Sequence, residues 1–216
     1  MEKNRIPKMA VILSLLLFLA GCAGIPVRDE VKVNMKVPVG KIAGNQFAGL
    51  RYPFNVTAPP GWQVSTQYPE FMLKLGFEKE GLEESEVFVF NPATQSNIQI
   101  DFTPAGRYST FNQEKIQWLT HAAGGAFEDE FRKDYGKNVS FDISTTEPYP
   151  LKEVPFAAKR YTTYTVKGIK REHGWIYAFA EPYQIFIIYV VMDQGEPKDR
   201  QDMKAILDSF EVTSQK

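Results

Sequence analysis

Cys22 carries the one thiol in a sequence of 216 residues. A thiolate is a nucleophile and a metal ligand, so this side chain is the first candidate for chemistry. No second cysteine is present, and the chain therefore forms no disulfide within itself. Leu19, Ala20 and Gly21 precede the thiol directly, and the last two are small. The role of Cys22 must follow from this context, and the stability of the chain must come from packing.

The segment before Cys22 has the features of a signal peptide. Residues 1–8 are polar and include Lys3, Arg5 and Lys8, and residues 9–20 are a continuous apolar run apart from one serine. A membrane-spanning helix needs about 20 apolar residues, so this run is too short to be one. The plain alternative is a secretory signal that happens to end near a cysteine.

Residues 19–22, Leu-Ala-Gly-Cys, resemble the lipobox of bacterial lipoprotein precursors at all four positions. The resemblance implies transfer of diacylglycerol to the Cys22 thiol, removal of residues 1–21, and membrane anchoring by acyl chains such as palmitate. Stable anchoring needs more than one such chain. In the sorting rule of enteric bacteria an aspartate at the next position retains the protein at the inner membrane. Ala23 therefore implies the periplasmic face of the outer membrane, if the source is Gram-negative.

The charge balance excludes one class of partner. The chain has 25 Lys and Arg against 26 Asp and Glu, a formal net charge of −1. Nucleic-acid binding needs a basic patch that neutralises phosphates, and no basic cluster is present. We expect no nucleic-acid partner, and we expect the membrane to be reached through acyl chains and not through a polybasic surface.

The mature chain divides into a tether and a domain. Residues 22–45 contain the cysteine and several glycines and prolines, which favour a tether. Alternating apolar residues at positions 31–37 allow a short strand inside it. Residues 46–216 carry the periodic patterns and are predicted to form a single α+β domain.

Two helices and a series of strands are predicted in this domain. Residues 112–135 carry an apolar stripe at helical spacing, with Gly124-Gly125 marking either a kink or a close approach to a sheet. A second helix begins near Pro197. Pro59-Pro60-Gly61 and Lys167-Gly168 indicate turns. Strands are expected at residues 47–57, 63–67, 71–77, 87–90, 97–102, 139–144, 156–166, 175–180 and 183–192.

The strand at 183–192 sets the expected layering. Residues 185–191 are apolar at every position and not at alternate ones. A strand of this kind is covered on both faces. We therefore expect an antiparallel sheet with a helix on at least one side.

This arrangement resembles the PsbP-like fold. The resemblance rests on Tyr-Pro-Phe at 52–54, Pro-Gly-Trp at 60–62 and Ile-Leu-Asp-Ser-Phe at 206–210, and it covers about residues 46–213. It implies an antiparallel sheet flanked by helices, an α/β/α sandwich. The group includes small bacterial lipoproteins and serves mostly in accessory or partner-binding roles. It has no shared catalytic site, so the resemblance implies no functional residue.

The two histidines are the candidates for hydrolytic catalysis. A serine nucleophile needs a base that is oriented by a carboxylate. His121 lies on the predicted long helix, and His173 lies beside Gly174 in a predicted hairpin. No serine occupies a Gly-x-Ser-x-Gly elbow. We interpret both histidines as surface or helix-flanking residues and predict no catalytic residue.

Metal and cofactor binding are not predicted either. Zinc would need clustered Cys or His, and phosphate binding would need a glycine-rich loop before a helix. An acidic segment at residues 78–86 lacks the spacing of a calcium loop, and we interpret it as solvated. Its glutamates are Glu78, Glu80, Glu83, Glu84 and Glu86.

Aromatic residues give the remaining candidate site. Trp175, Tyr177 and Phe179 alternate along one strand and share a face. Packing under a helix is the plain interpretation. A partly exposed apolar groove for a peptide, a lipid or a partner protein is the functional one.

The sequence thus predicts an envelope lipoprotein with a non-enzymatic binding or accessory role and a possible protein partner in the envelope. Two alternatives stay open. An unrecognised hydrolase would place His121 or His173 beside a serine and a carboxylate. A carrier of apolar ligands would have a deep cavity lined by aromatic side chains.

Overall fold

A computed structural model describes residues 27–74, 85–136, 139–193 and 198–213. The predicted signal peptide and Cys22 lie outside these residues. The described residues fall into two units, and the smaller one comprises residues 27–30 and 106–110. Within it, the Arg28 guanidinium donates to the carbonyl oxygens of Gly106 (3.0 Å) and Ser109 (2.6 Å). The larger unit carries the helices and strands.

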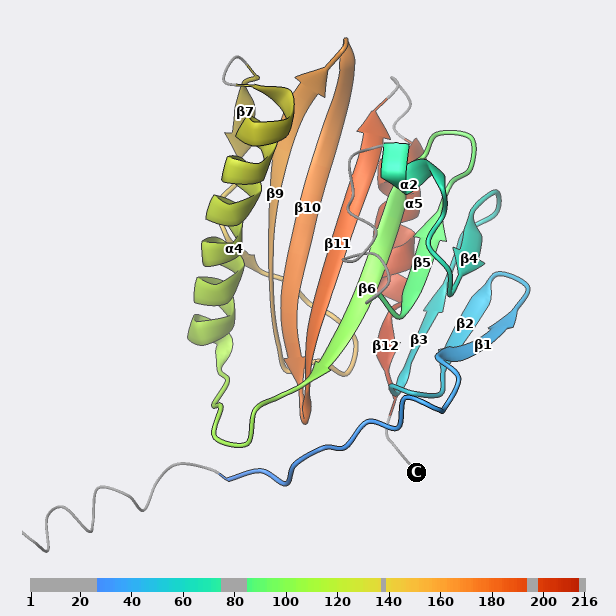
Figure 1. Ribbon diagram of the computed structural model, residues 1–216, viewed down its shortest axis with the longest axis vertical. Coiled ribbons are helices and arrows are strands. Elements are labelled where there is room, and N and C mark those ends of the chain that lie inside the picture. Colours follow the sequence, from blue (N-terminus) through green and yellow to red (C-terminus); the bar gives the residue numbers. More distant parts are fainter. Residues whose placement is uncertain (1–26, 75–84, 137–138, 194–197, 214–216) are drawn as a thin grey trace, which may run out of the picture. The chain divides into compact units, whose positions relative to one another are not determined.

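The strands of the larger unit form two antiparallel sheets in the described residues, one of four strands and one of eight (Figure 1). The small sheet, in spatial order, is β1 (Gly40–Ala43), β2 (Gln46–Gly49), β3 (Phe54–Thr57) and β12 (Glu211–Val212). The large sheet, in spatial order, is β4 (Gln63–Ser65), β5 (Val87–Phe90), β6 (Asn97–Pro104), β11 (Tyr183–Asp193), β10 (Ile169–Ala180), β9 (Phe156–Val166) and β7 (Phe141–Ile143), and β8 (Glu147–Pro148) also pairs with β9.

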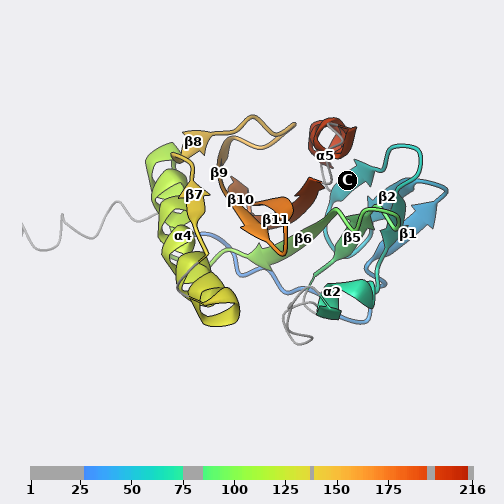
Figure 2. The same cartoon turned by 90° about the horizontal axis from the view of Figure 1, so that it is seen from above.

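Helices lie on both faces of the large sheet (Figure 2). On one face α4 (Gln113–Tyr135) packs against β9 and β10. On the other face α5 (Lys198–Ser209) packs against β11 and against β3 of the small sheet. The main apolar core fills the space between the large sheet, the small sheet and α5. The predicted antiparallel α+β sheet with flanking helices is therefore confirmed.

Helix α4 is fixed at its start and at its middle. The Asn112 side chain caps the helix by accepting a hydrogen bond from the Lys115 amide (2.8 Å). Gly124 is buried against the sheet, and a Cβ atom there would lie 3.2 Å from Cζ2 of Trp175 and 2.6 Å from Nη1 of Arg160. The glycine therefore permits the close helix–sheet approach that was one of the two interpretations of Gly124-Gly125.

The segments named in the resemblance hold α5 to the small sheet. The Trp62 indole donates to the Asp202 carboxylate (2.9 Å). The Ser209 hydroxyl donates to the carbonyl of Thr57 (3.1 Å) and accepts from its amide (2.9 Å). Phe54 of β3 lies 5.8 Å from Phe210, centroid to centroid. The Pro-Gly-Trp and Ser-Phe patterns thus meet in space and join the two ends of the domain.

The tether interpretation fits the described residues only in part. Residues 40–45, which were assigned to the tether, form β1 and its turn into β2. The alternating residues 31–37 form no strand. Val31, Val33 and Val39 instead pack against the main core as partly buried side chains. The ordered packing of the larger unit therefore begins upstream of residue 46.

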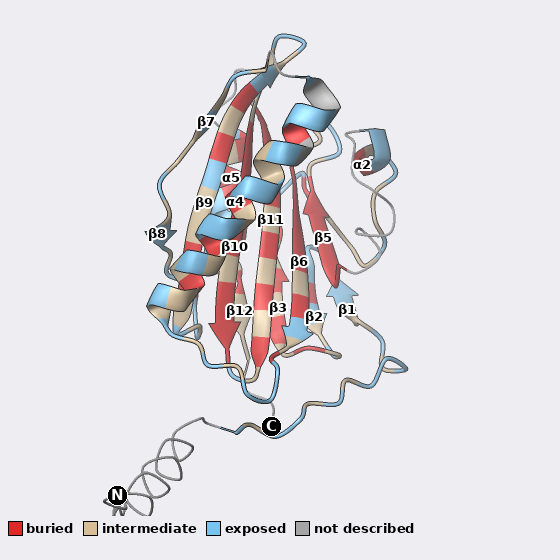
Figure 3. Cartoon of the chain, turned by 60° about the vertical axis from the view of Figure 1, so that its left-hand side comes forward, coloured by how far each residue is buried: buried red, intermediate tan, exposed pale blue. Residues whose placement is uncertain are grey.

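The expectation that β11 is covered on both faces is wrong at two positions. Ile185 and Ile187 are fully buried on the face toward α5, whereas Phe186 and Ile188 on the other face are only half-buried (Figure 3). The reason is that α4 packs mainly over β9 and β10. This partly uncovered face is the floor of the candidate site.

Candidate functional site

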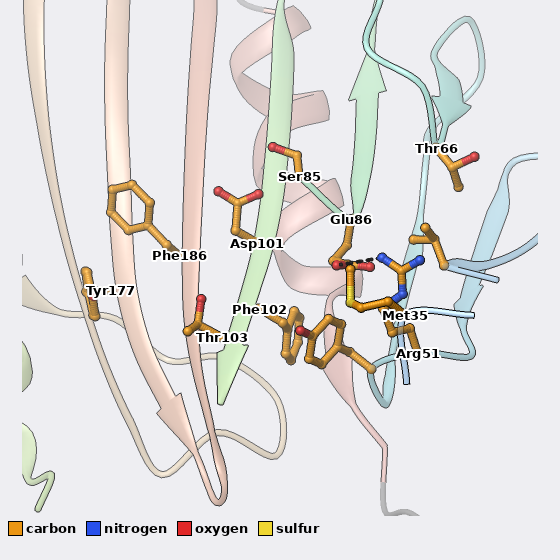
Figure 4. Close-up of a pocket in the computed structure, with 12 residues that line it drawn as sticks. Met35, Arg51, Thr66, Ser85, Glu86, Asp101, Phe102, Thr103, Tyr177 and Phe186 are labelled. Atoms are coloured by element: carbon orange, nitrogen blue, oxygen red, sulfur yellow. Dashed lines mark ion pairs between the residues drawn. The ribbon is translucent and has the colours of Figure 1, made fainter. Parts of the chain in front are cut away.

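A pocket of about 780 Å³ lies on the same face of the large sheet as α4, over the strands that α4 does not cover (Figure 4). On this face, Met72 of the short helix α2 (Phe71–Lys74) packs against Phe88 and Phe90 of β5. Residues from strands, loops and the segment before β1 line the pocket: Met35, Val39, Arg51, Tyr52, Thr66, Ser85, Glu86, Asp101, Phe102, Thr103, Tyr177 and Phe186.

Four of these residues form a row across the strands. Phe186 on β11 is the direct partner of Asp101 on β6 and of Tyr177 on β10. Glu86 comes immediately before β5, whose first residue pairs with the neighbour of Asp101, so Glu86 lies beside Asp101. Figure 4 shows Asp101 between Glu86 and Phe186. The Tyr177 and Phe186 rings are 5.3 Å apart. The floor is therefore acidic at one end and aromatic at the other.

Glu86 is a buried carboxyl group, with a relative exposure of 5%. Burial raises its pKa to about 7, the Asp101 carboxylate adds to the rise, and the Arg51 guanidinium opposes it. Nη1 of Arg51 lies 3.5 Å from Oε1 of Glu86. Burial, helped by Glu86, also raises the pKa of the Tyr52 hydroxyl. Glu86 therefore changes its charge near neutral pH, inside a pocket that a ligand can enter.

Two buried polar atoms near this floor have no hydrogen-bond partner among the described residues. They are Oε2 of Glu86 and Nε2 of Gln99. Oε1 of Gln99 accepts a hydrogen bond from the hydroxyl of Ser85, which lines the pocket (3.3 Å). A buried polar group without a partner costs about 1–3 kcal/mol. Both atoms are buried, so a local rearrangement that admits water or a ligand group to them would recover that free energy.

The three residues of the predicted aromatic groove separate in the structure. Trp175 is fully buried under α4, and its indole donates to the carbonyl of Thr120 (2.8 Å). Phe179 is buried and stacks on Phe111, with centroids 4.3 Å apart. Trp175 and Phe179 therefore pack under a helix and do not form an exposed groove. Tyr177 is half-buried and lines the pocket.

The histidines do not form a catalytic triad in the described part of the chain. His121 is exposed on α4, where Nδ1 lies 3.2 Å from the guanidinium of Arg160. His173 is buried under α4 with its ring edge-on to Phe127 and Phe131, so a surface position is wrong for it. Burial lowers the pKa of His173 to about 3, which leaves it a poor base near neutral pH.

Only part of the acidic segment at residues 78–86 lies within the described residues. Glu78, Glu80, Glu83 and Glu84 lie outside the described residues, whereas Glu86 is buried in the pocket and not solvated as expected. In the described ranges, no group of three or more His, Cys, Asp or Glu side chains is arranged to hold a metal ion. None of the helices in the described residues has the length and apolarity to cross a membrane.

Sequence reasoning missed Arg51, Asp101 and Phe186 and misplaced Glu86. Asp101 alternates with apolar residues on β6, which is the pattern of a solvent-facing position. Phe186 lies in a run that is apolar throughout, so nothing distinguished it from its neighbours. The one available signal was Glu86 directly before an apolar strand, where the strand's alternation carries it onto the same face as Phe88.

No family model and no curated protein matches the sequence. Among solved structures, the chain is similar to the cyanobacterial PsbP protein CyanoP of Synechocystis, with a TM-score of 0.54 and 10% identity, over 81% of this chain and 99% of that one. LpqN of Mycobacterium tuberculosis, described as involved in cell envelope biogenesis, gives 0.49 and 10% identity over 74% and 83% of the two chains. A protein of Bacteroides thetaiotaomicron gives 0.44 and 11% over 81% and 50%. The likeness to CyanoP establishes the fold: this chain has a PsbP-like α+β fold.

Proposed function

We propose that this chain is a bacterial envelope lipoprotein, held on a membrane by acyl chains on Cys22, whose domain binds a ligand or a segment of an envelope protein without catalysing a reaction. The binding site is the pocket over β5, β6, β11 and β10. Anchoring is supported by the complete Leu-Ala-Gly-Cys lipobox after a short apolar run. It places the domain at a membrane surface, where an accessory protein would meet its partner.

The row of Glu86, Asp101, Phe186 and Tyr177 is the observation that carries the binding role. It places carboxyl groups and aromatic rings on one floor, under a pocket of about 780 Å³. Ligand sites in proteins are typically concave, with an apolar part for affinity and a few polar groups for orientation. A ligand with both an apolar part and hydrogen-bonding groups fits this floor.

The pocket residues also argue against the two alternative functions, a carrier of apolar ligands and a hydrolase. A carrier of purely apolar ligands would bury them against Glu86, Asp101 and Arg51, and each polar group that lost water without a new partner would cost free energy. A hydrolase of the histidine type would need a base in the pocket, and neither His121 nor His173 lines it. Binding of a mixed polar and apolar group is the function that these residues support best.

A bulky substitution in the pocket tests the proposal. Thr103 is exposed on the floor, so Thr103→Trp should fill the pocket without disturbing the core. Thr165 is exposed on β9 with its side chain on the opposite face, and Thr165→Trp is the matched control. The measurement is complementation of a deletion strain, with the amount of each protein checked by blot.

We expect Thr103→Trp to lose function at normal abundance and Thr165→Trp to retain it. Full complementation by both variants would show that the pocket is not the functional site. Loss of function by both at normal abundance would equally remove the support for this site.

A further inference from the structure

The opposite face of the large sheet holds a second cavity, of about 260 Å³, between the strands β9, β10 and β11 and the helix α5. Three basic side chains meet at its wall. Lys159 comes from β9, and Arg200 and Lys204 come from consecutive turns of α5. The cavity is separate from the pocket described above, because Lys159 and the floor residues Asp101, Phe186 and Tyr177 lie on different faces of the sheet.

Lys159 is held among tyrosine rings. Its Nζ lies 4.9 Å from the ring centroid of Tyr189, 5.3 Å from that of Tyr149 and 5.8 Å from that of Tyr161. Such rings attract a cation but accept none of its hydrogen bonds in the way an oxygen does. Among the described residues, no carboxylate forms an ion pair with Lys159. Glu147, its partner across β8 and β9, accepts instead from the Thr145 hydroxyl (3.1 Å).

The carboxylates near the cavity are already engaged. Buried Glu172 accepts from the Tyr189 hydroxyl (2.8 Å) and pairs with Arg200. Tyr189 is fixed in this position because its ring occupies the space over Gly174, where any Cβ would clash with it. Asp208 pairs with Lys204 on the exposed side of α5. Lys159 thus adds a positive charge that these carboxylates do not pair directly.

This charge is unfavourable where it lies. Burial lowers the pKa of the Lys159 ammonium, and the charges of Arg200 and Lys204 lower it further, against the attraction of Glu172. Lys159 is half-buried, and the loss of part of its hydration is costly unless the charge is paired and hydrogen-bonded. An anion in the cavity would supply both, since it would accept hydrogen bonds from Lys159 and offset the repulsion among the three cations.

We propose that this cavity binds a phosphate or a similar oxyanion, with Lys159, Arg200 and Lys204 as the residues that neutralise it. The Tyr149 hydroxyl, whose pKa burial raises to about 12, stays protonated and is a further donor at the cavity wall. The group can be a free phosphate or the phosphate of a lipid headgroup, since both present the same oxygens.

The test measures how fast each individual lysine is acetylated. The full chain is held in dodecyl maltoside micelles, which carry no phosphate, and is treated with acetic anhydride, and mass spectrometry of peptides gives the acetylation rate of each lysine. Inorganic phosphate should slow acetylation of Lys159 in a saturable way, because a bound anion both shields the amine and keeps it protonated. Sodium chloride of equal ionic strength should not do so. Lys170, exposed on β10, is the internal control.

A variant links the protection to the cavity. Lys204 is largely exposed, so Lys204→Gln should fold normally and should raise the half-protecting phosphate concentration about fivefold through the loss of one charge. Lys170→Gln should leave it unchanged. Arg200 is not used for this purpose, because its removal would leave buried Glu172 without its guanidinium.

Vesicles of phosphatidylcholine and phosphatidylglycerol, used in place of the micelles, separate the two sources of phosphate. Protection of Lys159 by these vesicles without added phosphate would assign the site to a headgroup, and protection by inorganic phosphate alone would assign it to a soluble anion. Unchanged reactivity of Lys159 under both conditions would overturn the proposal, as would equal protection by chloride.

Discussion

Glu86 couples the pocket to pH. Its carboxyl has a pKa of about 7 in the folded chain, mainly because of burial, against an ordinary value near 4.5. The folded chain therefore holds this proton more tightly than the unfolded chain does. The contribution of the proton to stability is complete below about pH 4.5 and is lost as the pH rises toward about 7.

We expect this to appear as a decrease in the free energy of unfolding with rising pH. One pKa unit corresponds to about 1.4 kcal/mol, and solvent in the open pocket screens the effect, so the decrease should be about 1–2 kcal/mol. Urea denaturation at several pH values measures it. Glu86→Gln mimics the protonated side chain and should remove the decrease.

Glu70→Gln, at an exposed glutamate before α2, is the matched control and should keep the pH dependence of the original chain. A Glu86→Gln variant that loses stability with pH as steeply as the original chain would contradict the assignment of the proton to Glu86.

At the scale of single elements, we expect substitutions on the two faces of strand β11 to differ in their cost in stability. Ile187 is fully buried toward α5, whereas Ile188 is half-buried on the face that α4 leaves open. Ile187→Ala should cost about 2–5 kcal/mol, as deletions of buried aliphatic groups do, and Ile188→Ala should cost about 1 kcal/mol. Denaturant unfolding of the two variants provides the comparison. Equal costs would mean that both faces of β11 are covered.

The elements themselves were largely predictable. The stripe between residues 112 and 135 has a clear helical period, and α4 spans Gln113–Tyr135. The strands predicted at 156–166 and 183–192 match β9 and β11, since β-branched and aromatic runs between turn residues are strong local signals. Local patterns sufficed wherever the structure depends on residues that are close in the sequence.

The coverage of each face was not predictable in the same way. An apolar run shows that a strand is buried, but the width of the cover depends on where α4 sits, and Gly124 permits that helix to lie close to Trp175. The pKa of Glu86 likewise depends on Arg51 and Asp101, which come from other elements. The site was therefore missed because its residues meet through tertiary packing.

At the scale of the whole molecule, the proposed anchor at Cys22 would hold the domain at a membrane surface. Cys22→Ser removes the thiol that would carry the lipid. We expect this variant to lose palmitate labelling and to appear as uncleaved precursor or as protein released from the membrane. The measurement is metabolic labelling followed by membrane fractionation. A labelled, membrane-bound Cys22→Ser protein would disprove the anchor.

The domain has two cavities with polar linings on opposite faces of one sheet. The larger pocket is proposed to take the ligand or partner, and the smaller cavity an oxyanion. Because the large sheet separates them, substitutions in one site should leave the other largely unaffected, as expected for residues that share no contacts. Function can therefore be assigned to each face separately.

Photo-cross-linking in living cells tests the binding role most directly. A photoreactive phenylalanine analogue replaces Met35, an exposed residue that lines the pocket, in one protein and exposed Thr165 on the opposite face in another. The account predicts a specific adduct at position 35 that mass spectrometry can identify, that is absent at position 165, and that disappears when Phe186→Glu is added on the floor. Adducts of equal yield at both positions, or none at position 35 in a chain that complements the deletion strain, would contradict it.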